Sequence, residues 1–199
     1  MNKPMQPARF SVCVYCGSRP GNSPGFADSA RVVGDWIGRQ GGRLVYGGGN
    51  NGLMGIAAQA TLDAGGQVLG IMPQALVERE WAKTNCTELR IVANMHERKY
   101  QMAEQADAFL ALPGGIGTFE ELFEVWTWRQ LGYHDKPIGL LNQQGYYDGL
   151  LAFVQSSVQH GFMNPWQMDL IQVSDAPLQL LPALVQAAGW PGLSHLDAI

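Results

Sequence analysis

The sequence lacks the features that mark membrane-spanning, secreted or nucleic-acid-binding proteins. No apolar run reaches the roughly 18 residues that a membrane-spanning helix needs, and residues 1–8 contain no apolar signal segment. The 13 Lys and Arg residues are interspersed with 17 Asp and Glu residues, for a net charge of −4. No basic patch therefore indicates binding to nucleic acid. We expect a cytoplasmic protein that binds neither nucleic acid nor membrane.

Cysteine is also scarce, with three residues in the chain. Cys13 and Cys16 form a C-x-x-C pattern, but they fall in an apolar run that predicts a strand. Residues three apart in a strand point to opposite faces and lie about 10 Å apart, whereas a disulfide needs Cα atoms within about 7 Å. Two buried, reduced thiols are therefore favoured over a redox pair. No spacing of His, Cys, Asp and Glu resembles a metal site, and we expect no metal and no cofactor.

Glycine and apolar residues are abundant, at 25 residues and 46% of the chain. Apolar strands alternate with helical patterns, which predicts a single-domain α/β, Rossmann-like three-layer fold with a mostly parallel sheet. We expect one nucleotide-binding domain over residues 9–190, a flexible tail over 1–8, a loose tail over 191–199 and an irregular connection over 74–86. The predicted strands are 10–16, 43–46, 67–72, 89–93, 108–112, 138–142 and 170–173, and the predicted helices are 26–40, 53–64, 95–106, 119–131, 147–160 and 177–188.

A first glycine-rich loop follows the second predicted strand, where residues 47–52 read G-G-G-N-N-G. The pattern G-x-G-x-x-G between a strand and a helix favours contact with a phosphate or ribose, because glycine lets the backbone approach the ligand. A tight turn that needs glycine for its geometry alone is the alternative. A dinucleotide site also needs an acidic residue at the end of the next strand. That strand ends in Ile71-Met72-Pro73, which argues against NAD.

A second glycine-rich loop, residues 113–121, reads P-G-G-I-G-T-F-E-E and joins a predicted strand to a predicted helix. Its backbone amides and the helix dipole favour an anion. Thr118 and Glu121 also match a capping box, with Thr118 at the N-cap and Glu121 reaching back to its amide. On pattern alone, this structural role is favoured for Glu121 over a catalytic one. The same geometry would place its carboxylate near a bound ribose.

Several segments of the chain resemble the lonely guy family, whose members were long labelled lysine decarboxylases. The P-G-G-x-G-T-x-x-E run at 113–121 resembles the signature of that family, and M-H-E-R-K at 95–99 resembles its second motif. Y-G-G-G at 46–49 with G-L-M-G at 52–55 resembles its first loop, and 131–137 and 142–147 also match family segments. The resemblance extends from about residue 10 to residue 162.

The resemblance implies a Rossmann-like homodimer that hydrolyses the N-glycosidic bond of purine nucleoside 5′-monophosphates. The substrates would be cytokinin riboside 5′-monophosphates, AMP or both, and the products free base and ribose 5-phosphate. The family's catalytic Arg and Glu correspond to Arg98 and Glu121. The candidate substrate-binding residues are Ser18, Gly47, Gly48, Gly49, Glu80, Arg98, Lys99, Gly114, Gly115, Ile116, Gly117, Thr118, Phe119 and Glu120.

Cleavage of this bond passes through an oxocarbenium-like ribose, which a carboxylate such as Glu121 can stabilise. Arg98 and Lys99 diverge by about 100° on their helix, so we expect Arg98 to face the site. A nucleotide-binding carrier or sensor is the alternative function, because one fold hosts both kinds of protein. A pyridoxal decarboxylase would need a lysine in a suitable setting, which the sequence does not indicate, and an oxidoreductase is disfavoured by the missing strand-end acid.

Overall fold

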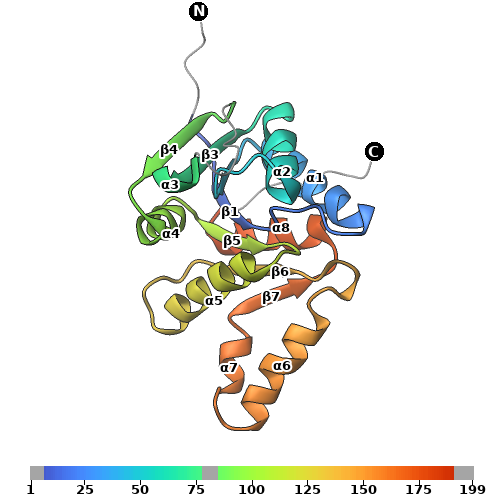
Figure 1. Ribbon diagram of the computed structural model, residues 1–199. Coiled ribbons are helices and arrows are strands. Elements are labelled where there is room, and N and C mark those ends of the chain that lie inside the picture. Colours follow the sequence, from blue (N-terminus) through green and yellow to red (C-terminus); the bar gives the residue numbers. More distant parts are fainter. Residues whose placement is uncertain (1–6, 78–84, 191–199) are drawn as a thin grey trace, which may run out of the picture.

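A computed structural model describes residues 7–77 and 85–190 and contains a seven-stranded, all-parallel sheet in the order β4-β3-β2-β1-β5-β6-β7 (Figure 1). The strands are β1 (Ser11–Tyr15), β2 (Arg43–Tyr46), β3 (Gln67–Pro73), β4 (Glu88–Val92), β5 (Ala108–Ala111), β6 (Ile138–Leu141) and β7 (Ile171–Ser174). The helices are α1 (Pro24–Arg39), α2 (Gly52–Asp63), α3 (Gln74–Val77), α4 (Met95–Glu104), α5 (Ile116–Gln130), the 3-10 turn η1 (Gln143–Gly145), α6 (Asp148–Gln159), α7 (Pro165–Met168) and α8 (Pro177–Ala187).

Side chains of the central strand alternate between two apolar cores, one on each face of the sheet. Val12 and Val14 of β1 pack in the core that α1, α2 and α8 cover, whereas Cys13 and Tyr15 pack in the core beneath α4, α5 and α6. Both faces are buried because the crossovers of a parallel sheet place helices on both sides. The predicted Rossmann-like three-layer fold is therefore confirmed.

The two cysteines of the C-x-x-C pattern lie in different cores, as the strand geometry predicted. Cys13 packs beneath α4–α6, Cys16 packs on the opposite side, and both are buried free thiols. Burial raises the pKa of each thiol well above its ordinary value. Both groups therefore stay protonated and packed in the core.

Three parts of the sequence prediction need correction. The connection over 74–86 is helical where it begins, in α3, and residues 78–84 lie outside the described part of the chain. The short helix α7 was not predicted, because its four residues leave no periodic pattern; a capping box of Asn164 and Gln167 begins it. Helix α5 begins at Ile116, three residues earlier than predicted. Residues 1–6 and 191–199, which make up most of the two predicted tails, also lie outside the described residues.

The strand order reverses direction at β1, and this reversal creates a crevice at one edge of the sheet. Starting from β1, the chain adds β2, β3 and β4 on one side and then crosses to β5 on the other. The loops after β1 and β5 therefore separate to opposite faces and leave a crevice at the carboxyl ends of these strands. None of the described helices has the length and apolar character needed to cross a membrane.

The loop after β1 is held by the start of α2. The amide of Leu53 donates to the carbonyl of Gly17 at 2.9 Å, and Gly52 has a positive φ of 60°. A Cβ on Gly52 would lie 2.3 Å from the carbonyl carbon of Ser18 and 2.4 Å from the amide of Arg19. Glycine at 52 is thus required both by the backbone conformation and by the close approach of the loop over residues 17–21.

We predict that Gly52→Ala destabilises the protein more than Gly65→Ala. Gly65 also has a positive φ, of 83°, so both substitutions incur left-handed strain of about 1–3 kcal/mol. A Cβ at Gly65 has no neighbour within 4 Å, whereas at Gly52 it meets backbone atoms. Urea denaturation of both variants measures the difference in the free energy of unfolding. Equal losses would contradict the packing of the β1 loop on α2.

Candidate active site

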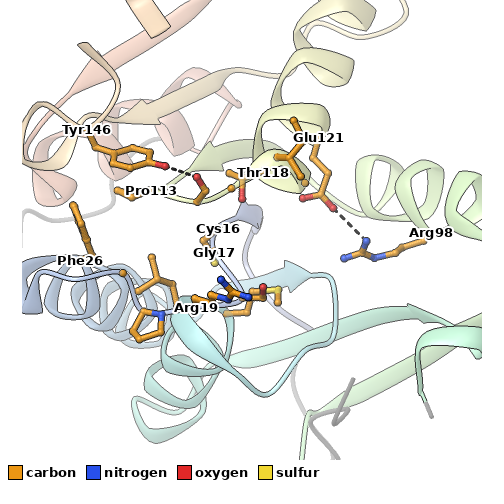
Figure 2. A pocket seen from close by; sticks show the side chains of 18 residues that line it. Cys16, Gly17, Arg19, Phe26, Arg98, Pro113, Thr118, Glu121 and Tyr146 are labelled. Carbon is orange, nitrogen blue, oxygen red and sulfur yellow. Dashed lines mark hydrogen bonds and ion pairs between the residues drawn. The ribbon is translucent and has the colours of Figure 1, made fainter. Parts of the chain in front are cut away.

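A cavity of about 600 Å³ opens where the loops after β1 and β5 separate (Figure 2). The two loops touch at its floor, since the amide of Gly17 donates to the carbonyl of Pro113 at 3.0 Å. The start of α5 forms one wall, and residues from α1, α2 and α4 complete it. The lining residues are Cys16, Gly17, Ser18, Arg19, Pro20, Gly21, Phe26, Leu53, Met54, Arg98, Pro113, Gly114, Gly115, Ile116, Gly117, Thr118, Glu121 and Tyr146.

Arg98 and Glu121 face each other in this cavity (Figure 2). Nη1 of Arg98 lies 3.5 Å from Oε1 of Glu121, and each side chain is only 12% exposed. Nε of Arg98 also donates to the carbonyl of Ile71, two residues before the end of β3. Gly47 leaves room for the guanidinium, because a Cβ there would lie 1.8 Å from Nη2 of Arg98. Arg98 therefore extends from α4 across the ends of β2 and β3 towards α5.

Glu121 has an acid strength suited to proton chemistry near neutral pH. Burial raises the pKa of its carboxyl from 4.5 to about 7, while the charge of Arg98 opposes this shift. A group whose pKa lies near the working pH is populated in both of its protonation states. Such a carboxyl can accept or donate a proton, or carry a negative charge opposite a developing cation. Among the described residues that line the cavity, it is the one carboxylic acid.

The capping box predicted for Thr118 and Glu121 is wrong. Helix α5 begins at Ile116 with Gly115 as its N-cap, and no side chain caps it. Gly115 adopts an extended conformation, which lets the helix begin directly after the glycine pair. Thr118 and Glu121 are consequently both inside the helix, one turn apart, and both face the cavity. Glu121 thus pairs with Arg98 and does not cap the helix, whose N-cap is Gly115.

Two adjacent tyrosines hold the loop after β5. The hydroxyl of Tyr146 donates to the carbonyl of Gly114 at 2.5 Å (Figure 2), and that of Tyr147 donates to the carbonyl of Leu112 at 2.6 Å. The side chain of Asn142 accepts the amide of Tyr147 at 2.7 Å. With these carbonyls engaged, the loop presents the amide end of α5 to the cavity.

The structure separates the predicted site residues that it describes into two groups. Arg98, Glu121, Ser18 and residues 114–118 line the cavity. Gly47–Gly49 are buried and lie outside its lining, as do the side chains of Lys99, Phe119 and Glu120. Glu80 lies outside the described residues.

Lys99 diverges from Arg98 as the helix geometry predicted. Its Nζ lies 2.5 Å from Oε1 of Glu120 and 2.9 Å from Oε1 of Glu124. Burial lowers the pKa of this amine, but the hydrogen bonds to the two carboxylates outweigh it, so the pKa is raised overall. A charged amine cannot form a Schiff base, which requires the neutral form. Lys99 therefore ties α4 to α5 beside the cavity.

The sequence did not predict how many residues of the loop after β1 line the cavity. Only Ser18 was predicted there, whereas the whole segment 16–21 lines the cavity. The available signal was Gly17, which directly follows the predicted strand 10–16 as Gly47 follows the predicted strand 43–46. Phe26, Met54 and Tyr146 left no such signal, because each belongs to a different helix or loop that only the fold brings together. Among the described residues, no cluster of His, Cys, Asp and Glu could hold a metal ion.

The same fold occurs in solved structures of low sequence identity. The Moco carrier protein from Chlamydomonas reinhardtii aligns with a TM-score of 0.67 and 18% identity, over 90% of this chain and 97% of that one. The molybdenum cofactor binding protein from Rippkaea orientalis aligns with a TM-score of 0.64 and 21% identity, over 85% and 91%. At these identities the likeness shows the fold alone.

A switch-point cavity that carries one buried carboxyl–guanidinium pair defines an α/β protein of the Rossmann-like class with a candidate active site. A family model described as possible lysine decarboxylase matches residues 54–184. The cytokinin riboside 5′-monophosphate phosphoribohydrolase LOG3 of Arabidopsis thaliana is 46% identical, over 92% of this chain and 86% of that protein. A probable enzyme of the same name, LOGL1 of Oryza sativa subsp. japonica, is 49% identical over 88% and 78%. The chain belongs to the lonely guy family of phosphoribohydrolases.

We predict that Arg98→Gln raises the pKa of Glu121 above 7, because the variant removes the opposing positive charge while burial remains. An NMR titration of the ¹³C-labelled carboxyl measures it, with Glu121→Gln to assign the signal. Lys99→Gln is the matched control: Lys99 lowers the same pKa less than Arg98 does, so a smaller upward shift is expected. An unchanged or lower pKa in Arg98→Gln would contradict the assigned contact.

Proposed function

We propose that the protein hydrolyses the N-glycosidic bond of purine nucleoside 5′-monophosphates, with cytokinin riboside 5′-monophosphate, AMP or both as substrates. Water adds across the bond between C1′ and the base: its hydroxyl remains on C1′ of ribose 5-phosphate, and its proton leaves with the base. The buried pair of Arg98 and Glu121 carries this proposal. The names of relatives that are 46–49% identical over most of the chain also support it.

Glu121 is the proposed catalytic carboxylate. The reacting ribose develops positive charge at C1′ and O4′, and an ionised carboxylate in a poorly solvated cavity stabilises that charge more than water does. The same oxygens can orient the ribose hydroxyls or accept a proton from the attacking water. Arg98 keeps a fraction of this buried carboxyl ionised near neutral pH, since its charge lowers the pKa that burial raises.

The start of α5 is the proposed phosphate site. Gly115, Ile116 and Gly117 line the cavity at the helix N-terminus, where unpaired amides and the helix dipole attract an anion. Thr118 adds a hydroxyl on the same wall. With a phosphate at this end, the ribose would extend along α5 towards Glu121, one turn further on.

Lys99 and Gly47, which were predicted to bind substrate, receive indirect roles. We propose that Lys99 positions α4 against α5 through Glu120 and Glu124, and that Gly47 leaves space for the guanidinium of Arg98. The homodimer implied by the family resemblance remains a prediction, as does the single domain over residues 9–190.

We predict that the purified protein releases free base from AMP or isopentenyl-AMP, and that Glu121→Gln lowers kcat by about 10²–10⁴-fold with little change in KM. Incubation with AMP, GMP, CMP and isopentenyl-AMP, followed by chromatography of the liberated bases, measures both. Glu104→Gln, which removes an exposed acid at the end of α4, should retain full activity.

The assay also distinguishes the alternative function. A carrier or sensor would bind a nucleotide and return it intact. Binding of AMP and isopentenyl-AMP without release of base from either would therefore reject the hydrolase. Full activity in Glu121→Gln would instead retain the reaction and reject the role given to this carboxyl.

We predict that kcat/KM rises with pH through about 7 and then levels off. The pKa of Glu121 is raised to about 7, so its carboxyl is neutral below that pH and ionised above it. An ionised carboxylate is the proposed active form, and activity should fall about tenfold per pH unit well below the pKa. Rates measured from pH 6 to 9 test the rise and the plateau, and the second pKa of a phosphate monoester, at about 6, sets the lower end of this range. A decline above pH 7 would show that Glu121 acts as a proton donor.

A further inference from the structure

Two arginines line the cavity, and they have different surroundings. Arg98 is largely buried and engaged, since it contacts Glu121 and the carbonyl of Ile71. Arg19 is exposed at the mouth of the cavity, on the loop after β1. Within residues 7–77 and 85–190, no carboxylate lies within ion-pair distance of Arg19. Its positive charge is therefore available to a ligand.

The backbone that carries Arg19 is held from two sides. Gly52 of α2 packs against the peptide between Ser18 and Arg19, and Leu53 donates to the carbonyl of Gly17. On the other side, Gly17 donates to Pro113 of the loop after β5. The backbone of Arg19 is therefore held in place next to the loop after β5. This reduces the conformational entropy that is lost when Arg19 contacts a ligand. In Figure 2 it lies across the cavity from Thr118 and Glu121.

The charge of the proposed substrate favours a second cation beside the amides of α5. A phosphate monoester carries about −1.5 to −2 charges at neutral pH, and the described lining of the cavity contains one acid, Glu121, which Arg98 already faces. In a nucleoside 5′-monophosphate, the atoms O4′, C4′, C5′ and O5′ separate C1′ from the phosphorus. A substrate with C1′ beside Glu121 therefore has its phosphate away from Arg98, in the part of the cavity that the α5 start and Arg19 share.

We propose that Arg19 binds the 5′-phosphate of the substrate from the side opposite the amides of α5, and that it thereby sets the preference for nucleotides over nucleosides. The guanidinium suits this task because its planar N–H groups match two phosphate oxygens at once. This inference rests on the proposed function for the location of the ribose. It adds a specificity residue on the β1 loop, separate from the catalytic pair.

Binding of ribose 5-phosphate tests this proposal independently of turnover. In calorimetry we expect Arg19→Gln to weaken the binding of ribose 5-phosphate by about 10- to 100-fold, as the loss of a charge-assisted contact does. Arg19→Lys keeps the charge and loses the paired geometry. Its affinity for ribose 5-phosphate should lie between those of the parent and Arg19→Gln. Arg31→Gln is the matched control: it removes an exposed arginine of α1, paired with Asp28, that does not line this cavity.

Kinetics give the second readout. In Arg19→Gln the KM for AMP should rise about tenfold or more while kcat changes little, and turnover of adenosine should not change. Unaltered binding of ribose 5-phosphate in Arg19→Gln, or an equal loss for adenosine and AMP, would overturn the role of Arg19. Absence of ribose 5-phosphate binding by the parent protein would overturn it as well.

The two proposals fail in different ways. If the parent releases no base from any nucleotide, yet ribose 5-phosphate binds and Arg19→Gln weakens it, the hydrolase is rejected and the phosphate site stands. If the parent cleaves AMP and Arg19→Gln cleaves it with the same KM, the hydrolase stands and the assignment of Arg19 is wrong.

Discussion

The contact between Arg98 and Glu121 is the interaction on which the site depends. A carboxyl this deeply buried loses most of its hydration, so burial alone would favour its neutral form. The guanidinium 3.5 Å away restores part of the charged form. The balance places the pKa near neutrality, where a small change in surroundings alters the protonation state. The acid strength of the site thus comes from two opposing effects.

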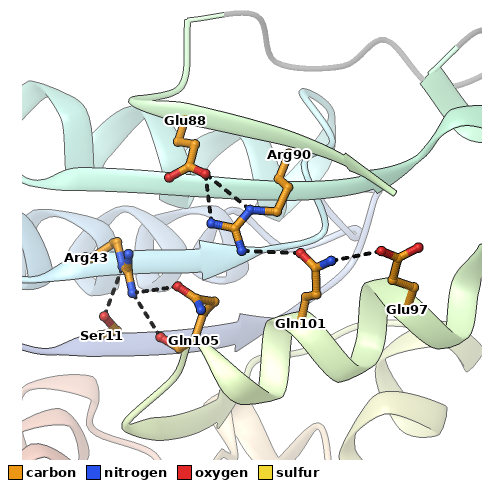
Figure 3. Close-up of polar contacts among 7 residues, drawn as sticks. All are labelled: Ser11, Arg43, Glu88, Arg90, Glu97, Gln101 and Gln105. Carbon is orange, nitrogen blue, oxygen red and sulfur yellow. Dashed lines mark hydrogen bonds and ion pairs between the residues drawn. The ribbon is translucent and has the colours of Figure 1, made fainter. Parts of the chain in front are cut away.

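The parallel sheet brings these two residues together from distant parts of the sequence. Arg98 belongs to α4 and Glu121 to α5. These helices lie in two consecutive crossovers, β4 to β5 and β5 to β6, on the same face of the sheet. Lys99 stabilises this arrangement, because it bridges Glu120 and Glu124 on the adjacent helix. A polar network also lies along α4 (Figure 3). Within it, Gln101 bonds to Arg90 and Glu97, and the C-cap residue Gln105 bonds to Arg43. Helix α4 is therefore held along its length, and Arg98 with it.

The fold class was predictable because its determinants are local. Buried parallel strands are apolar throughout, glycines follow several of them directly, and helical periodicity fills the intervals between them. The start of α5 was not predictable. Thr118 and Glu121 match a capping box in sequence, yet the extended backbone of Gly115 begins the helix three residues earlier. A one-turn pattern cannot distinguish the two starting points.

The sequence by itself determined the parallel α/β architecture, the opposite orientation of Cys13 and Cys16, the divergence of Arg98 from Lys99, and the family signature around Glu121. Each follows from the short-range periodicity of strands and helices or from a contiguous motif. Only the tertiary structure decided that the β1 loop lines the cavity and that Glu121 pairs with Arg98. Strand order determines which strand ends become neighbours, and this order depends on long-range packing of whole elements, which no local pattern encodes.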